Sequence, residues 1–253
     1  MSSKIPTLTV VGAGPGDIDL ITLKAVKAIE SANVILYDAL VNKALLDYAS
    51  KDAELIFVGK RRGCYAFQQE QINELIVAKA KEKGHVVRLK GGDPLIFGRG
   101  AEELDYVKPF GLKTFVVPGI TSAIAVPAYQ GIPLTKRGAS ESFWVITGTT
   151  KNHQLSTDVT LAAKSTATVV ILMGMHKLNE IVNVFLKENK HDVPVAIIQS
   201  GTTKDEKVGI GTISTILQIV EDKQLGSPAI IVIGEVVKQR TVLSSICEDI
   251  ALA

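Results

Sequence analysis

The stretch Val10–Asp17, VVGAGPGD, places a glycine-rich turn directly after the first apolar run of the chain. A strand, a glycine turn and a helix in this order open many nucleotide-binding α/β domains. A dinucleotide fingerprint needs glycine at its first, third and sixth positions, and here only Gly12 and Gly14 comply. The sixth position is Asp17, which would put a carboxylate where a pyrophosphate binds. The stretch therefore predicts an α/β fold and disfavours a dinucleotide, while a tight turn without any ligand stays open.

Outward from this turn, short apolar runs alternate with helical patterns, which is typical of a mostly parallel sheet with helices on both faces. The first helix is expected to begin with Asp17 or Asp19 as its N-cap. Strands are predicted at 8–11, 34–37, 55–58, 86–89 and 115–117, and helices at 19–31, 43–48, 68–83, 99–106 and 121–128. A second set predicts strands at 143–147, 169–172, 195–199, 207–211 and 229–233, and helices at 176–188 and 212–221.

The segment Gly131–Ser142, rich in turn-forming and charged residues, separates the two sets of elements. We therefore predict two α/β domains, residues 1–135 and 136–253. The uncharged stretch Thr114–Thr135 is long enough to span a membrane. Because it contains three prolines and two glycines, we interpret it instead as a strand, a loop, a short helix and a turn.

The composition narrows the class of protein. The chain has 253 residues, 46% of them hydrophobic, with a formal net charge of +2, so bulk charge does not indicate a nucleic-acid or membrane-surface protein. Its two cysteines, Cys64 and Cys247, form no CxxC pair, and its first ten residues lack the pattern of a signal peptide. We therefore expect a reduced, cytoplasmic protein. The four histidines have no metal-ligand spacing, and no metal site is predicted.

A second glycine turn lies in the stretch Arg88–Gly100, RLKGGDPLIFGRG, at the end of the fourth predicted strand. Open α/β sheets bind ligands at such strand ends. The glycines let a ligand approach the backbone, and the aspartate of GGD offers an acceptor. An ordinary solvated turn is the alternative. Further along, Thr121 and Ser122 are expected to cap the short apolar helix, which is compatible with ligand contact.

The arginines are few and are placed unevenly. There are six of them against 22 lysines, and four lie in glycine-containing turns, namely Arg61, Arg62, Arg99 and Arg137. Lys60 and Lys136 stand in the same turns. Arginine suits bidentate recognition of carboxylate or phosphate, so this placement favours a polyanionic substrate over a set of solvated surface charges.

Taken in order, these pieces resemble the uroporphyrinogen-III C-methyltransferases of the tetrapyrrole methylase superfamily. The similar stretches are VVGAGPGDIDLITLKA, YDALV, VGKRRG, RLKGGDPLIFGRGAEE and VVPGITSAIAVPAYQGIPLTKR, followed by VILMG, IIQSGTT and SPAIIVIGEVV. They cover about residues 7 to 240. Five spaced motifs in one order are far more specific than any single glycine turn.

The resemblance implies a fold and an activity. It implies two α/β domains, each a mixed sheet flanked by helices, in a homodimer, with S-adenosyl-L-methionine in the cleft between the domains. It further implies methylation of uroporphyrinogen III at C2 and C7, giving precorrin-1 and then precorrin-2, with S-adenosyl-L-homocysteine as the by-product. That product leads to sirohaem, cobalamin and related tetrapyrroles. No nucleic acid or membrane partner is expected.

The resemblance also assigns roles to individual residues. The cofactor contacts would be Pro15, Gly91, Gly92, Asp93, Ile96, Thr121, Ser122, Met173, Gly201 and Ala229. The catalytic set would be Asp38, Lys60 and Arg99, with Asp38 and Lys60 matching the residues that handle protons. The general base itself stays open between Asp38 and an arginine that acts through the substrate's own groups. The eight carboxylates of the substrate would bind Arg61, Arg62, Arg99 and Arg137, with Lys136 in support and Met173 beside them. Glu102 would either bond a pyrrole N–H or orient Arg99. One departure is Leu172, where tyrosine is common in the family.

Three alternatives remain open from the sequence. One is another methyltransferase of the superfamily that acts on a later precorrin or on a substrate of another kind. The second is a non-catalytic protein that senses S-adenosylmethionine, which the retention of Asp38, Lys60 and the turn arginines disfavours. The third is an NAD dehydrogenase, which the mismatch at Asp17 disfavours.

Overall fold

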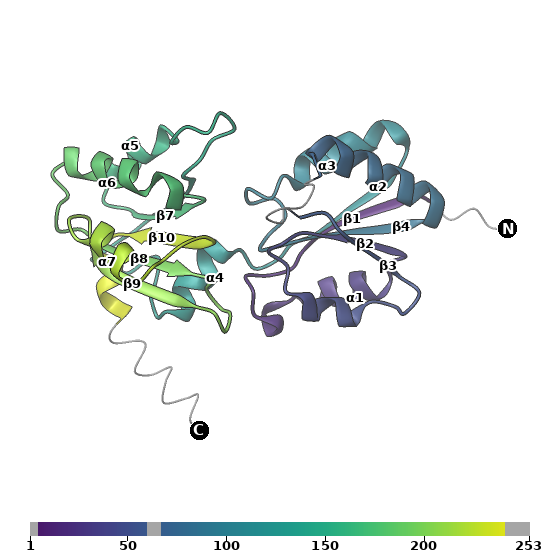
Figure 1. The fold of residues 1–253 in the computed structure, drawn as a ribbon, viewed down its shortest axis with the longest axis horizontal. Helices are drawn as coiled ribbons and strands as arrows, with labels where there is room; N and C mark the ends of the chain where they lie inside the picture. The colour runs from purple at the N-terminus through teal and green to yellow at the C-terminus, as the bar shows by residue number, and fades with distance from the viewer. Residues whose placement is uncertain (1–4, 60–66, 241–253) are drawn as a thin grey trace, which may run out of the picture. The chain divides into compact units, whose positions relative to one another are not determined.

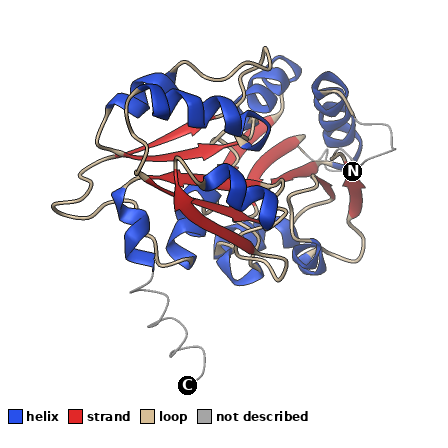
Figure 2. Ribbon diagram, turned by 60° about the vertical axis from the view of Figure 1, so that its left-hand side comes forward, coloured by secondary structure: helices blue, strands red, loops and turns tan. Residues whose placement is uncertain are grey.

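The computed structural model describes residues 5–59 and 67–240 of the chain. Contacts between Cα atoms divide the chain into two compact units, 1–121 and 122–253. Each unit is built on a five-stranded sheet flanked by helices (Figures 1 and 2). The α/β class expected from the alternation of strands and helices is confirmed.

The sheet of the first unit is entirely parallel. Its strands lie in the order β3-β2-β4-β1-β5, and every neighbouring pair runs in the same direction. Their bounds are β1 Thr7–Gly12, β2 Val34–Tyr37, β3 Glu54–Phe57, β4 His85–Lys90 and β5 Lys113–Val117. The expectation of a mixed sheet is wrong for this unit, because a helical crossover follows each of the first four strands and returns the chain to the same end. All five carboxyl ends therefore lie at one edge.

Helices cover both faces of this sheet (Figure 1). The helix α1, Leu23–Glu30, and the short helix η2, Lys43–Tyr48, pack on one face. The helices α2, Gln69–Lys83, and α3, Gly100–Val107, pack on the other. Two further short helices are η1, Ile18–Leu20, and η3, Lys108–Phe110.

The first α-helix begins later than the sequence pattern predicted. Thr22 is the N-cap of α1, and its hydroxyl accepts the amide of Ala25 at 3.1 Å. Asp17 caps only η1, where its carboxylate accepts the amide of Asp19 at 2.9 Å. The prediction that Asp17 or Asp19 is the N-cap of α1 is therefore wrong. Both residues are good capping types, and the sequence alone does not separate a cap of a short 3₁₀ turn from a cap of the helix that follows.

The sheet of the second unit is mixed, as the resemblance implied. Its strand order is β6-β7-β10-β8-β9; β6 and β7 are parallel and the other pairs antiparallel. The bounds are β6 Phe143–Thr147, β7 Thr168–Leu172, β8 Pro194–Gln199, β9 Lys207–Thr212 and β10 Ala229–Ile233. On one face pack α5 Asp158–Lys164, α6 Leu178–Lys187 and α7 Ile216–Asp222. On the other pack α4 Ser122–Tyr129 and η5 Glu235–Gln239, and η4 Met175–Lys177 precedes α6.

The structure divides the chain between Thr121 and Ser122, whereas the sequence pattern predicted a division after residue 135. The helix α4 accounts for this difference. Its buried residues Ala123 and Val126 join a core cluster with Val170 of β7 and Val232 of β10. The helix therefore belongs to the second unit, although it directly follows the last strand of the first. The stretch 114–135 forms the end of a strand, a loop and this short helix. Among the described residues, no helix has the length and apolar character needed to cross a membrane.

Candidate active site

The two glycine turns of the first unit are tied together by their backbones. The amide of Gly14 donates to the carbonyl of Gly92 at 3.2 Å, and the amide of Gly92 donates back to the carbonyl of Gly14 at 2.7 Å. Gly14 has φ of +77° and Gly92 has φ of +67°, a conformation that glycine adopts without steric cost. The turns after β1 and β4 therefore form one paired structure at the carboxyl edge of the sheet.

A third turn, after β5, packs against this pair. A Cβ atom at Gly12 would lie 2.5 Å from the Cα of Gly119 and 2.7 Å from the carbonyl oxygen of Gly92. A Cβ atom at Gly119 would lie 2.3 Å from the same carbonyl oxygen. These distances leave no room for a side chain. The first glycine of VVGAGPGD is therefore required by backbone packing between strand ends, and this requirement is independent of any phosphate.

Asp93 links the turn after β4 to the turn after β5. Its Oδ2 accepts the amide of Gly119 at 3.1 Å, and its Oδ1 accepts the amide of Leu95 at 2.8 Å. Both carboxylate oxygens are therefore engaged with backbone in the structure. Of two other residues predicted to contact the cofactor, Pro15 lies in the turn after β1 and Ile96 in the turn after β4, where its side chain is exposed.

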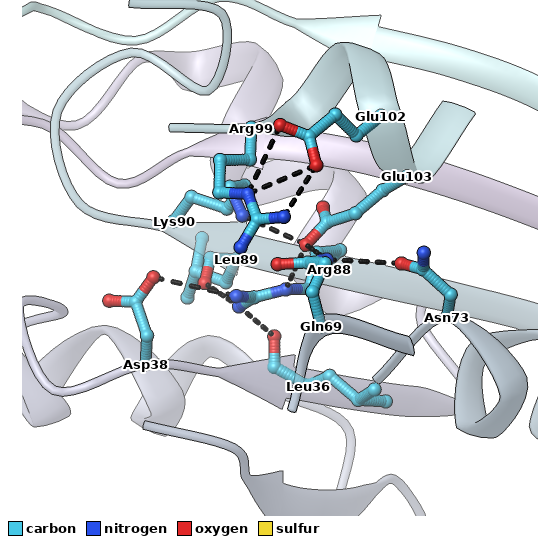
Figure 3. A network of polar contacts seen from close by, with 10 residues as sticks. All are labelled: Leu36, Asp38, Gln69, Asn73, Arg88, Leu89, Lys90, Arg99, Glu102 and Glu103. Carbon is cyan, nitrogen blue, oxygen red and sulfur yellow. Dashed lines mark hydrogen bonds and ion pairs between the residues drawn. The ribbon is translucent and has the colours of Figure 1, made fainter. Parts of the chain in front are cut away.

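Asp38 lies immediately after β2, at the same carboxyl edge (Figure 3). Its Oδ1 accepts the amide of Leu40 at 3.1 Å, and its Oδ2 lies 3.6 Å from Nη2 of Arg88. The side chain of Arg88 is 5% exposed and that of Asp38 is 25% exposed. The carboxylate is thus held on both sides and remains partly open to solvent.

Behind Asp38 lies a buried charged cluster formed by Arg88, Lys90 and Glu103 (Figure 3). Oε1 of Glu103 accepts from Nε of Arg88 at 3.1 Å and from Nζ of Lys90 at 2.9 Å. Gln69 of α2 donates to the same oxygen at 3.2 Å. Burial, and next the positive charge of Arg88, lower the pKa of Lys90 below its ordinary value of 10.5.

Arg99 and Glu102 form an exposed pair at the start of α3 (Figure 3). Nη2 of Arg99 lies 2.5 Å from Oε2 of Glu102, and Nε donates to both carboxylate oxygens at 3.1 Å. Arg99 has a left-handed backbone, with φ of +62°. Glu102 therefore orients the guanidinium of Arg99, one of the two roles that the sequence suggested for it.

In the second unit, three residues predicted to contact the cofactor lie at one edge of the sheet. Met173 follows β7, Gly201 follows β8 by two residues, and Ala229 begins β10. The strand register pairs Ala229 with Gln199, which places these positions at the same end. Met173 is half exposed and has φ of +55°, an uncommon conformation for a residue with a side chain. Such strained positions gather at functional sites.

The remaining predicted residues are placed as follows. Ser122 is the first residue of α4, and Thr121 directly precedes it. Arg137 is exposed in a tight turn closed by the amide of Lys136, which donates to the carbonyl of Ser140 at 2.9 Å. Lys60, Arg61 and Arg62 lie outside the described residues.

In each unit, part of the predicted set lies at one edge of the sheet: Asp38, Gly91, Gly92 and Asp93 in the first unit, and Met173, Gly201 and Ala229 in the second. Arg137 is not at that edge, because its turn precedes β6 and the turn residue Ser140 accepts the hydroxyl of Thr168 at the start of β7.

Arg88, Lys90 and Glu103 have no role among those predicted from the sequence. A signal for them was present, since HVVRLK puts two cations on one face of a buried strand, and these need a buried acid.

The chain has two α/β units, and the first has paired glycine turns and charged side chains at the carboxyl ends of its parallel strands. These features indicate the class of α/β enzymes that bind small molecules. A family model supplies the finer assignment, because the model of the tetrapyrrole (corrin/porphyrin) methylases matches residues 7–217. The chain belongs to this family.

Individual relatives agree with this assignment. The chain is 50% identical to a uroporphyrinogen-III C-methyltransferase from Methanocaldococcus jannaschii, over 90% of this chain and 95% of the relative. It is 45% identical to an S-adenosyl-L-methionine-dependent uroporphyrinogen III methyltransferase from Methanosarcina barkeri, over 96% of each chain. Among solved structures, a Thermus thermophilus uroporphyrin-III C-methyl transferase complexed with S-adenyl homocysteine is similar with a TM-score of 0.79 and 33% identity, over 92% of this chain and 99% of that one.

Proposed function

We propose that the chain transfers methyl groups from S-adenosylmethionine to C2 and C7 of uroporphyrinogen III, giving precorrin-2 by way of precorrin-1. The observation that carries the proposal is the carboxyl edge of the parallel sheet. There, paired glycine turns, the held carboxylate of Asp38 and the exposed guanidinium of Arg99 occur together. The names of the relatives above support the same substrate and methyl donor.

The residues at the strand ends suit S-adenosylmethionine. Asp17, Asp38 and Asp93 follow three of the parallel strands, and these carboxylates favour a cationic ligand over a pyrophosphate. The residues that would hold it are Pro15, Gly91, Gly92, Asp93, Ile96, Thr121, Ser122, Met173, Gly201 and Ala229. When bound, S-adenosylmethionine supplies a methyl group on a positively charged sulfur and becomes S-adenosylhomocysteine.

The arginines would hold the acetate and propionate arms of the substrate. Arg99 is already oriented by Glu102, and Arg137 is exposed in its turn. Arg61, Arg62 and Lys60 of the VGKRRG motif would complete the set. Each charge-assisted hydrogen bond contributes about 1.5–3 kcal/mol where water is excluded. Several such bonds would fix the pyrrole carbon in line with the methyl group, and positioning of this kind can supply several kcal/mol of the barrier reduction.

Asp38 would accept a proton. When the pyrrole carbon uses its electron pair to bond the methyl group, the substrate gains a positive charge and must lose a proton. The carboxylate of Asp38 is partly exposed and held in place on both sides, which suits a general base. Lys60 would serve as the second proton-handling group.

The replacement Arg99→Gln is expected to raise the KM for uroporphyrinogen III about ten- to a hundredfold. It removes one or two charge-assisted bonds worth about 1.5–3 kcal/mol. The dissociation constant for S-adenosylmethionine is expected to stay unchanged. Initial rates across substrate concentrations and calorimetric titration with the methyl donor measure the two quantities.

Arg240→Gln is the matched control, because Arg240 bonds Gln130 in the second unit and lies outside the glycine turns. Its KM is expected to equal that of the wild type. An unchanged KM in Arg99→Gln would remove Arg99 from the substrate-binding set.

Another methyltransferase of the same family would act on a different tetrapyrrole. The two functions differ in which tetrapyrrole gains methyl groups. Parallel assays with uroporphyrinogen III and with precorrin-2 separate the two functions, because the proposed function requires precorrin-2 to accumulate as the product.

We also propose that the protein forms a homodimer. In the second unit, Ile124, Pro133, Leu134 and Phe143 line an apolar hollow, and Ile124 and Phe143 are exposed. Exposed apolar patches of this kind often mark protein contacts. Sedimentation equilibrium at micromolar concentration is expected to give twice the mass of the chain, and a monomer mass would overturn this proposal.

A further inference from the structure

Glu103 is a fully buried carboxylate placed between two cations. Its side chain is 0% exposed, and those of Arg88 and Lys90 are each 5% exposed. Oε1 carries all three of its hydrogen bonds described above, while Oε2 is buried without a hydrogen-bond partner among the described residues. Burying such charges is costly, and apolar replacements of similar volume are often as stable. The cluster therefore needs an explanation other than stability.

Glu103 fixes the orientation of the Arg88 guanidinium, and this orientation explains why the buried cluster is present. Oε1 binds the Nε edge of the guanidinium, and Nη1 donates to the carbonyls of Leu89 at 3.0 Å and Leu36 at 3.4 Å. The remaining nitrogen, Nη2, faces Oδ2 of Asp38 at 3.6 Å. Because the guanidinium is planar and rigid, fixing its Nε edge also fixes where Nη2 points.

Strand register places the members of this chain of contacts on one side of the sheet. Arg88 pairs in register with Leu36 of β2, and Asp38 follows two residues later, so both side chains extend to the face covered by α2 and α3. Lys90 lies two residues beyond Arg88 on the same face and directly precedes Gly91. Glu103 approaches from α3, as Figure 3 shows.

We propose that Glu103 is a positioning residue for methyl transfer, which acts through Arg88 on the carboxylate of Asp38. Glu103 neutralises one of the two buried cations and fixes the guanidinium that holds Asp38. Lys90 anchors Glu103 from the other side. The inference rests on the proposed function, since it assigns Asp38 the role of base.

The test is a double-mutant cycle with Glu103→Gln and Asp38→Asn. Glu103→Gln alone is expected to lower kcat about 10- to 100-fold, the size found when a group that orients a metal-binding side chain is removed. The KM for uroporphyrinogen III and the affinity for S-adenosylmethionine should remain unchanged. In the Asp38→Asn background the same replacement should change kcat by no more than about twofold, the scatter of independent measurements. Release of S-adenosylhomocysteine gives kcat in each case.

A purely structural role predicts a different pattern. The loss would then appear in full in both backgrounds, or it would appear as weaker binding of the methyl donor. Either result, or a kcat unchanged by Glu103→Gln, would overturn the proposal. Glu54→Gln is the matched control, because it breaks the ion pair of Glu54 with Lys79, 2.7 Å apart, at the opposite end of the same sheet. Its kcat is expected to equal that of the wild type.

If Glu103→Gln does not fold, the replacement Arg88→Lys tests the same positioning role. It preserves the positive charge beside Glu103 and removes the nitrogen that reaches Asp38. Arg88→Lys is expected to lower kcat by the same factor in the wild-type protein and to leave kcat unchanged in the Asp38→Asn background. An equal loss of kcat in both backgrounds would overturn the proposal. Failure of the proposed function is distinguishable, because the wild-type protein would then form no methylated product. Failure of the base role is distinguishable too, because Asp38→Asn alone would retain full kcat.

Discussion

Replacing Asp38 by asparagine is expected to lower turnover about 10²- to 10⁴-fold, the contribution typical of a general base. Asparagine preserves the shape of the side chain and an oxygen that can accept the amide of Leu40, but it cannot take up a proton. The affinity for S-adenosylmethionine should therefore remain that of the wild type. Single-turnover methyl transfer and a titration with the methyl donor measure the two effects.

Asp52→Asn is the control for this replacement. Asp52 is an exposed aspartate of the same unit, in a turn before β3, and accordingly away from the carboxyl edge. Its turnover is expected to be unchanged. A turnover of Asp38→Asn equal to that of the Asp52 variant would show that another group removes the proton.

The replacement Gly12→Ala is expected to disrupt the turns of the first unit. The added Cβ would lie 2.5 Å from the Cα of Gly119, so the ends of β1 and β5 must move apart. Overpacking of this kind costs about 1–3 kcal/mol of the free energy of unfolding. A displacement near 1 Å at a site can lower the rate about 10²-fold. We expect both effects, measured by chemical denaturation and by kcat/KM for S-adenosylmethionine.

Gly226→Ala is the matched glycine replacement. A Cβ atom there meets only Oε1 of Gln199, at 3.9 Å, which is an ordinary contact distance. Its free energy of unfolding and its kcat/KM are expected to be close to those of the wild type. A Gly12→Ala variant as stable and active as this control would contradict the requirement for close backbone packing at the strand ends.

The fold was predictable where apolar runs had clear ends. The strands at 34–37, 143–147 and 229–233 were predicted with the bounds they have in the structure. The helix α5, Asp158–Lys164, was missed because its buried face is formed by Val159, Ala162 and Ala163, and two alanines give a weak apolar pattern. The assignment of α4 was also beyond the sequence, since its apolar residues can pack on either sheet and only tertiary contacts decide.

The site was predictable in part. The glycine turns at the strand ends, the position of Asp38 after β2 and the pairing of Arg99 with Glu102 follow from motifs. The roles assigned to Asp38 and Arg99 stay predictions. The cluster of Arg88, Lys90 and Glu103 does not follow from a motif. The acid that pairs with Arg88 is distant in the sequence, and the motif does not show which of the two neighbouring glutamates, Glu102 or Glu103, is buried. Glu102 is exposed and Glu103 is buried, a difference fixed by which face of α3 meets the sheet.

The most direct measurement incubates the purified protein with enzymatically made uroporphyrinogen III and S-adenosylmethionine, and follows the tetrapyrrole by mass spectrometry. The proposed function predicts a mass gain of two methyl groups, with two S-adenosylhomocysteine molecules formed for each product molecule. A protein that binds S-adenosylmethionine yet leaves the mass of uroporphyrinogen III unchanged would contradict it.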